Sequence, residues 1–122
     1  MSDLGDLAHD FSSLLLNGQA VAAAEKYWAV DIVSMEPENS REHGPAIVTG
    51  YKAAHYKLTS WLDHSAMEEL SIDGPFITGD HFALFIDMLI KRRATGERQP
   101  FSEIAIYTVR DQKIIEERYF YE

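Results

Sequence analysis

The sequence predicts an α+β domain in which three N-terminal helices pack on a strongly curved antiparallel sheet. Two observations lead to this class. Apolar residues at helical spacing dominate the first half of the chain, and long runs rich in β-branched and aromatic residues fill the second half. Helices that are segregated from antiparallel strands are typical of α+β domains. A strongly bent sheet wrapped around a long helix is expected to leave a conical cavity between the two.

The composition is that of a single globular domain spanning residues 1–122, with 46% hydrophobic and 25% charged residues. A net charge of −9 argues against nucleic acid or an anionic membrane as the main partner. The chain has no cysteine, which excludes disulfides, thiolate nucleophiles and cysteine-bound zinc, and which suits the cytoplasm. Its acidic start lacks a long apolar run, so we expect neither a signal peptide nor a membrane span.

Two helices are predicted near the N-terminus. Apolar residues within 4–15 recur at helical spacing, and Ser2 or Asp3 is available as the N-cap. Asn17 and Gly18 then predict a helix stop, because both residue types tolerate the left-handed conformation. The alanine-rich segment 19–27 favours a second, short helix.

The middle of the chain predicts one strand and one long helix. Residues 32–36 have a β-rich pattern that ends at Pro37, and the polar segment 37–45 is expected to be a loop. A helix is predicted over residues 46–62. Its apolar stripe consists of Ile47, Tyr51, Ala54, Leu58, Trp61 and Leu62.

Two long strands follow the third helix. Residues 66–72 alternate weakly, and the strand is expected to resume at 76–78 after a bulge or edge feature at 73–75. Gly79 and Asp80 predict a turn into residues 81–90, which are apolar on both faces. Because this pattern requires cover on both sides of the strand, we expect a homodimer that buries the outer face of the sheet.

The last third of the chain predicts a β-hairpin. The charged segment 91–100 is expected to be a connecting loop, residues 101–110 and 113–122 are two strands, and the turn lies at residues 111–112. Alternation divides the side chains of each strand between two faces. One face of the first strand carries Phe101, Glu103, Ala105, Tyr107 and Val109, and one face of the second carries Ile115, Glu117, Tyr119 and Tyr121.

The order of these elements resembles the nuclear transport factor 2-like superfamily and, within it, the SnoaL-like proteins of bacteria. The landmarks are Asn17-Gly18, the segment 27–37, Gly50-Tyr51-Lys52-Ala53, and the closing pattern that joins Glu103, Tyr107, Val109, Asp111, Lys113, Ile114, Glu116 and Glu117. The resemblance covers nearly the whole chain and implies a cone-shaped, cystatin-like α+β barrel. Members of this superfamily include isomerases, cyclases, hydrolases, dehydratases and non-catalytic binders.

The resemblance also implies roles for individual residues. By similarity to ketosteroid isomerase-like members, Glu36 falls at the position of the catalytic base, and Glu103 falls near that of the proton-donating carboxyl. Phe11 stands where a donor tyrosine is expected, and a phenyl ring cannot donate a hydrogen bond. Gln112 is a second departure, because relatives often carry glycine at a turn that needs positive φ.

The candidate catalytic residues are Glu36, Glu103 and His64. A carboxylate in an apolar pocket gains a raised pKa and can move a proton α to a carbonyl, whereas a carboxylate at a wet strand end does not. His64 follows Trp61 at a helix end and is either an acid, base or donor, or a surface histidine. The candidate pocket-lining residues are Tyr107, Glu117, Tyr119, Tyr121, Trp61, Trp28, Met88 and Phe11.

Several of these residues have ordinary structural alternatives. Trp28 and Trp61 are expected on amphipathic helices, where aromatics more often belong to the core. Glu117 has arginines at 98, 110 and 118 as alternative partners. Asp87, inside an apolar strand, must find a hydrogen-bond partner if it is buried, for which an interface is favoured over catalysis.

No cofactor or metal site is expected from the sequence. The histidines do not form pairs three or four residues apart on a helix, and glycine-rich phosphate loops and serine-nucleophile motifs are absent. The five histidines are His9, His43, His55, His64 and His81.

Three functions remain open at this stage. The first is an enzyme that acts on a small hydrophobic carbonyl compound, with a tyrosine or His64 stabilising the oxyanion. The second is a module that binds a small hydrophobic molecule without converting it. The third is a structural dimer whose own side chains fill the cavity, which a cavity volume would distinguish from the other two.

Overall fold

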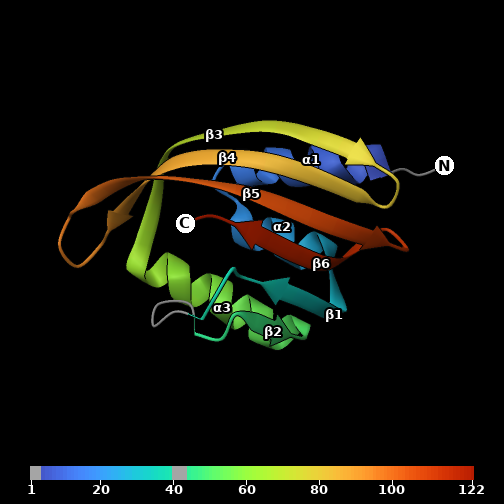
Figure 1. Ribbon diagram of the computed structural model, residues 1–122, viewed down its shortest axis with the longest axis horizontal. Helices are drawn as coiled ribbons and strands as arrows, with labels where there is room; N and C mark the ends of the chain where they lie inside the picture. The colour runs from blue at the N-terminus through green and yellow to red at the C-terminus, as the bar shows by residue number, and fades with distance from the viewer. Residues whose placement is uncertain (1–3, 40–43) are drawn as a thin grey trace.

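The computed structural model describes residues 4–39 and 44–122. Figure 1 shows three helices packed along one side of a long, curved sheet. The helices are α1 (Leu4–Leu16), α2 (Ala20–Tyr27) and α3 (Tyr51–His64). The strands are β1 (Trp28–Met35), β2 (Ile47–Thr49), β3 (Ser65–Thr78), β4 (His81–Arg92), β5 (Arg98–Arg110) and β6 (Lys113–Phe120).

The six strands form one sheet in the order β2-β1-β6-β5-β4-β3. All neighbouring strands are antiparallel except β1 and β6, which run parallel, so the expectation of a wholly antiparallel sheet was wrong at this pair. Figure 1 shows α1 and α2 behind the long strands and α3 beside β1 and β2 at the lower edge. The helices and the concave face of the sheet therefore enclose one space. This arrangement confirms the predicted α+β class.

The third helix begins later than predicted. Residues 47–49 form β2 instead, which pairs with the end of β1. The β-branched Ile47, Val48 and Thr49 favour a strand. Gly50 has a φ of 97°, a conformation that interrupts any helix running from residue 46.

Two other boundaries differ from the prediction because strands extend further than their alternation suggested. β1 begins at Trp28 rather than at residue 32, so Trp28 is a strand residue and not a helix residue. The predicted loop over 91–100 shrinks to a turn, because β4 continues to Arg92 and β5 begins at Arg98. Of the charged residues at these ends, Arg98 is exposed, whereas Lys91 and Arg92 are half-buried.

β3 contains two irregularities. The predicted one is present, because the register to β4 shifts between Asp73 and Phe76. The other lies between Glu68 and Ser71, where Glu69 has a φ of 50°. A bulge of this kind reverses the side-chain alternation of the strand. It lets the three apolar residues Met67, Leu70 and Ile72 all line the same cavity.

A third irregularity lies in β6 and corrects one predicted face. Thr108 pairs with Glu116, but Val109 pairs with Ile114, so Ile115 has no partner in the ladder. Ile114 is therefore the buried residue of the pair, and Ile115 does not continue the face of Glu117 as alternation alone predicted. The turn keeps its predicted position, with Gln112 at a φ of 61° in place of glycine.

The core lies between α1, α2 and the inner face of the long strands. Phe11 makes edge-to-face contacts with Tyr107 and Phe82, at centroid distances of 5.0 and 6.0 Å, and the latter two rings stack on each other. All three side chains are buried. They close the deep end of the space enclosed by the sheet and the helices.

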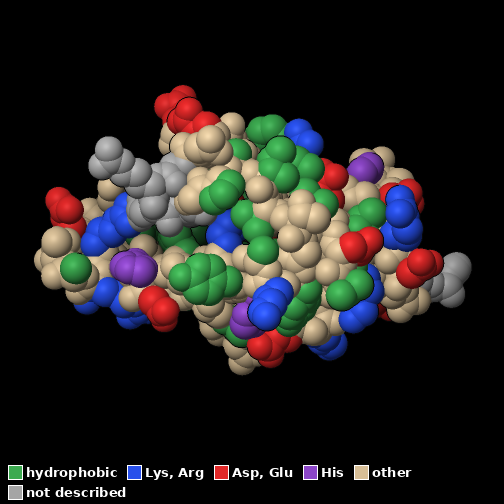
Figure 2. All heavy atoms as spheres, turned by 90° about the horizontal axis from the view of Figure 1, so that it is seen from below, with side chains coloured by type: hydrophobic (Ala, Val, Ile, Leu, Met, Phe, Trp, Pro, Cys, Tyr) green, Lys and Arg blue, Asp and Glu red, His purple; other side chains and the backbone are tan. Residues whose placement is uncertain are grey.

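The predicted N-caps Ser2 and Asp3, like His43, lie outside the described residues. Within the described part of the chain, no helix is long and apolar enough to cross a membrane. The face that carries α3 and β2 intermixes acidic, basic, histidine and apolar side chains (Figure 2).

Candidate functional site

A pocket of about 400 Å³ occupies the space between the helices and the concave face of the sheet. Ten of the eleven candidate site residues line it. These are Phe11, Trp28, Glu36, Trp61, Met88, Glu103, Tyr107, Glu117, Tyr119 and Tyr121. The volume falls in the range of small-molecule sites, which begins at about 300 Å³. The side chains of the protein therefore do not fill the cavity, against the third function considered above.

His64 is the candidate that the structure places elsewhere. It is exposed at the last residue of α3, and its Nδ1 lies 2.8 Å from the carbonyl oxygen of Ser60 in the preceding turn. His64 is absent from the described lining of the pocket. Its surroundings are those of a surface histidine at a helix end, which was the alternative to a catalytic role.

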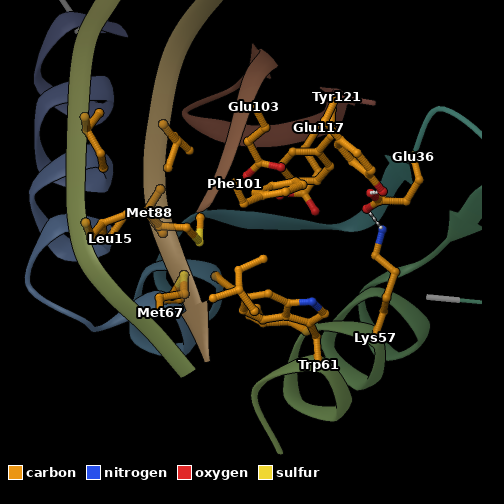
Figure 3. A pocket seen from close by; sticks show the side chains of 18 of the residues that line it. Leu15, Glu36, Lys57, Trp61, Met67, Met88, Phe101, Glu103, Glu117 and Tyr121 are labelled. Atoms are coloured by element: carbon orange, nitrogen blue, oxygen red, sulfur yellow. Dashed lines mark hydrogen bonds and ion pairs between the residues drawn. The ribbon is translucent and has the colours of Figure 1, made fainter. Parts of the chain in front are cut away.

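The pocket has an apolar end and a polar end (Figure 3). Leu15, Met67 and Met88 point into the apolar end from α1, β3 and β4. Four of the labelled side chains gather at the polar end, and they are Glu36, Glu103, Glu117 and Tyr121. Such a cavity suits a largely apolar molecule that carries a polar group at one end.

Glu36, immediately after β1, forms an ion pair at the polar end. Its Oε2 lies 2.8 Å from Nζ of Lys57, and both side chains are nearly removed from solvent, with exposed fractions of 7% and 11%. The hydroxyl of Tyr121 donates to the other carboxylate oxygen at 2.6 Å. Glu36 thus accepts hydrogen bonds from two donors, one of which is a cation.

Glu117 is joined to the same cation through a serine. The Ser34 hydroxyl donates to Oε2 of Glu117 at 2.7 Å, and Lys57 Nζ donates to Ser34 Oγ at 2.6 Å. Ser34 and Glu117 are register partners on the parallel strands β1 and β6. Two of the three expected arginine partners are engaged elsewhere, since Arg98 binds Glu68 and Arg118 binds Glu116.

Glu103 projects from β5 toward the cavity in the same polar end (Figure 3). Burial raises the pKa of its carboxyl to about 8, and the negative charges of Glu36 and Glu117 add to the rise, while Lys57 opposes it. The side chain keeps some accessible surface because one side faces the cavity, although protein atoms surround its carboxyl. Glu103 is therefore protonated at neutral pH and able to donate a hydrogen bond.

Burial also raises the pKa of the tyrosines around these carboxyls. The shift is upward for Tyr107 and Tyr119, where the nearby Glu117 adds to it, and for Tyr121, where the hydrogen bond to Glu36 adds to it. Burial raises the pKa of Glu117 as well, against the hydrogen bond from Ser34. The phenols remain neutral hydrogen-bond donors throughout the physiological range.

The sequence analysis missed Lys57 and Ser34. Lys57 lies three residues after Ala54 and four before Trp61, both in the predicted apolar stripe, so helical periodicity could have placed it on the pocket side. Ser34 lies two residues after the buried Ile32 on β1, so strand alternation could have placed it on the same inner face. Lys57 was not singled out because a lysine next to an apolar stripe usually lies at the edge of the stripe, with its charge in solvent.

The polar end can support acid–base chemistry. It combines a protonated carboxyl, an ion-paired carboxylate and neutral phenols around one cavity, and two carboxyl groups in different protonation states are the usual basis for moving a proton. Among the described residues, no three histidine or acidic side chains converge in an arrangement that could hold a metal ion.

Comparison with known proteins gives a consistent picture. The sequence pattern of the SnoaL-like domain matches residues 4–121. The crystal structure of a candidate SnoaL-like polyketide cyclase from Mesorhizobium loti is 37% identical, covers 98% of this chain and 100% of its own, and superposes with a TM-score of 0.89. No curated protein matches the sequence.

More distant structures share the fold. A nuclear transport factor 2-like protein of unknown function from Burkholderia pseudomallei has 10% identity and a TM-score of 0.83, with 100% of this chain and 92% of that one covered. TerC, co-crystallised with polyporic acid, has 13% identity and a TM-score of 0.77, with 96% and 89% covered. At these identities the likeness concerns the fold alone.

Proposed function

Because the chain belongs to the family of SnoaL-like domains, we propose that it is an acid–base enzyme of the isomerase or cyclase type, acting on a small hydrophobic carbonyl compound. The observation that carries this proposal is the protonated Glu103, which faces an apolar cavity beside the anionic Glu36. A neutral carboxyl in such a place can donate to a carbonyl oxygen, and a carboxylate can accept a proton from the neighbouring carbon.

The proposed step is enolisation. Glu36 takes a proton from the carbon α to the carbonyl, the C–H electron pair forms the enolate, and Glu103 stabilises the developing negative oxygen through its hydrogen bond. Return of the proton from Glu36 to a different carbon gives an isomer. Alternatively, the enolate carbon attacks a second carbonyl of the same molecule and closes a ring. The oxygen of that second carbonyl then takes the proton back from Glu36. In both outcomes Glu36 ends as a carboxylate and Glu103 as an acid.

A non-catalytic binding module is the second candidate function. The apolar lining from α1, β3, β4 and α3 supports it equally well, and TerC, of similar fold, was crystallised with a small molecule. The two candidates differ only in whether a proton leaves the bound molecule.

The test follows both binding and proton transfer. N-phenyl-1-naphthylamine, a neutral fluorescent probe, reports occupancy of the cavity, and apolar cyclic ketones such as 1-tetralone compete with it. NMR in deuterium oxide measures incorporation of deuterium at the α carbon of the same ketones. We expect incorporation above the buffer rate for ketones that compete, and a loss of about 10²- to 10⁴-fold in Glu36→Gln and Glu103→Gln.

Each outcome has one meaning. Competition without isotope incorporation across the ketone panel would establish the binding module instead of the enzyme. Failure of every neutral probe to bind would refute both. Glu69→Gln, at an exposed residue of β3, serves as the control for changing one carboxyl to an amide.

We further propose that the protein works as a homodimer through the outer face of the sheet. Phe85, Ile104 and Phe120 are aligned across β4, β5 and β6, and 38%, 44% and 46% of their surfaces are exposed. An aligned apolar row of this kind favours association of two copies. On the same face, Asp87 accepts a hydrogen bond from Ser102 of the neighbouring strand, which satisfies it without a partner subunit.

A further inference from the structure

Lys57 is a charged residue in a pocket wall that is otherwise apolar along its helix. Its side chain extends from α3 toward the polar end, where its ammonium contacts Glu36 and Ser34 at 2.8 and 2.6 Å. The ammonium also lies 5.8 Å from the ring centroid of Tyr119. Only 11% of the side chain surface is exposed. Burying an ammonium is costly unless it is paired, so this position is defined by its partners.

Carboxyl groups outnumber cations among the described residues that line the pocket. Glu36, Glu103 and Glu117 gather at the polar end, where Lys57 contacts Glu36 directly, and Glu38, Glu122 and Arg92 also line the pocket. Lys57 binds Glu36 directly and reaches Glu117 through Ser34. No hydrogen bond from a described residue to the carboxyl of Glu103 accompanies these contacts, so Glu103 is the member of the three that faces the cavity alone.

We propose that Lys57 is the positioning residue that assigns the two catalytic roles, by holding Glu36 as the anionic base and leaving the proton of the site on Glu103. This inference rests on the proposed function and adds to it a residue that takes no part in the proton transfer. Without the cation, the hydroxyl of Tyr121 is the donor that still distinguishes Glu36 from Glu103.

The charge of Lys57 acts on more than Glu36. It lowers the pKa of both Glu103 and Glu117 against the effect of burial, and burial is the larger effect at Glu103. The groups that face this cluster come from β1 and its end, α3, β5 and β6. They are Ser34, Glu36, Lys57, Glu103, Tyr107, Glu117, Tyr119 and Tyr121, and the charged residues Glu38, Arg92 and Glu122 also line the pocket.

Three substitutions separate the charge of Lys57 from its packing. Lys57→Arg keeps the cation, Lys57→Gln keeps hydrogen-bond donors without the charge, and Lys57→Met keeps only the apolar stem. Lys52→Met, at an exposed position one turn earlier on α3, is the matched control. If Lys57→Met does not fold, Lys57→Gln still tests the charge.

The direct readout is carbon NMR of protein labelled at the glutamate carboxyls, titrated between pH 4 and pH 10 and assigned with the Glu36→Gln and Glu103→Gln variants. We expect Lys57→Gln and Lys57→Met to raise the titration midpoint of Glu103 by on the order of one pH unit. Lys57→Arg and Lys52→Met should titrate as the wild type.

The kinetic readout uses the ketone that gives the fastest α-deuterium incorporation. Loss of the anionic base should lower the maximal rate of Lys57→Gln by about 10- to 100-fold, with little change in competition against N-phenyl-1-naphthylamine. Unchanged titration of Glu103 in Lys57→Gln would overturn the inference. If the wild type exchanges no ketone, the proposed function fails, while the NMR titration still decides what Lys57 does.

Discussion

The hydroxyl of Ser34 donates a 2.7 Å hydrogen bond to Glu117, and this bond joins the parallel strands β1 and β6 at a point where both side chains are buried. It links residues 83 positions apart in the chain. Ser34 and Glu117 belong to a row of register partners that crosses the sheet. Glu117 is also the partner of Tyr107, which in turn pairs with Phe82. The polar end of the pocket is thus built into the pairing of four strands.

Ser34→Ala is expected to destabilise the protein by about 1–3 kcal/mol, because the buried carboxyl of Glu117 loses one of its donors. Urea denaturation followed by circular dichroism measures the change. Ser71→Ala, at an exposed strand residue, should change stability by less than about 0.5 kcal/mol. Equal effects of the two substitutions would show that the Ser34 hydroxyl contributes nothing to stability.

Glu103→Gln should remove a pH dependence from the stability. Because the folded state raises the pKa of Glu103 from 4.5 to about 8, its contribution to stability is fully present below pH 4.5 and is lost as the pH rises to about 8. Relative to wild type, the variant should therefore gain stability between pH 5 and pH 9, on the order of 4 kcal/mol. Urea midpoints at these two pH values measure it, with Glu69→Gln as the control. A difference that does not grow with pH would contradict the raised pKa.

Gly74→Ala should be strongly destabilising. Gly74 has a φ of 120°, and a Cβ built there lies 2.9 Å from the carbonyl oxygen of Ala83 on β4. Strain and contact together are expected to cost about 2–4 kcal/mol. Gly79→Ala is the matched case, with a φ of 56° but no atom within 4 Å of the new Cβ, and should cost about 1–2 kcal/mol. If thermal melting gives the same loss for both, the contact with β4 has no energetic effect.

Ile104→Lys should abolish the proposed dimer, because it places a charge in the middle of the exposed apolar row of the outer face. Light scattering at micromolar concentration should give twice 13.9 kDa for wild type and 13.9 kDa for the variant. Ile47→Lys, in β2, where 61% of the isoleucine surface is exposed, should leave the mass unchanged. A monomeric wild type would disprove the dimer.

The sequence predicted most of the pocket because strand alternation is a local property. Glu103 and Tyr107 fall on one face by counting, and the pairing of β4, β5 and β6 follows from short turns. Once a hairpin is recognised, the faces of its side chains are largely determined. Counting assigned Ile115 to the wrong face because it lies at a bulge, where one additional residue reverses the alternation.

Other features were beyond local reasoning. The parallel pairing of β1 with β6 joins strands that are far apart in the chain, and nothing within either strand specifies its neighbour. Lys57 becomes a site residue only because α3 crosses the end of β1, which brings it to Ser34 and Glu36. His64 was favoured for its position after Trp61, but the last turn of α3 directs it to the surface.

The bulge at Glu69 has a consequence for how this protein can diversify. It lies in β3, at the edge of the sheet, and it determines which apolar residues of that strand face the ligand space. The acid–base groups lie on other segments, namely β1, α3, β5 and β6. Insertions, deletions or apolar exchanges between residues 65 and 78 therefore alter the size and shape of accepted molecules while the reacting groups stay in place. Under the proposed function, β3 is therefore a part of the chain where the shape of the cavity can change, by evolution or engineering, without touching the acid–base groups.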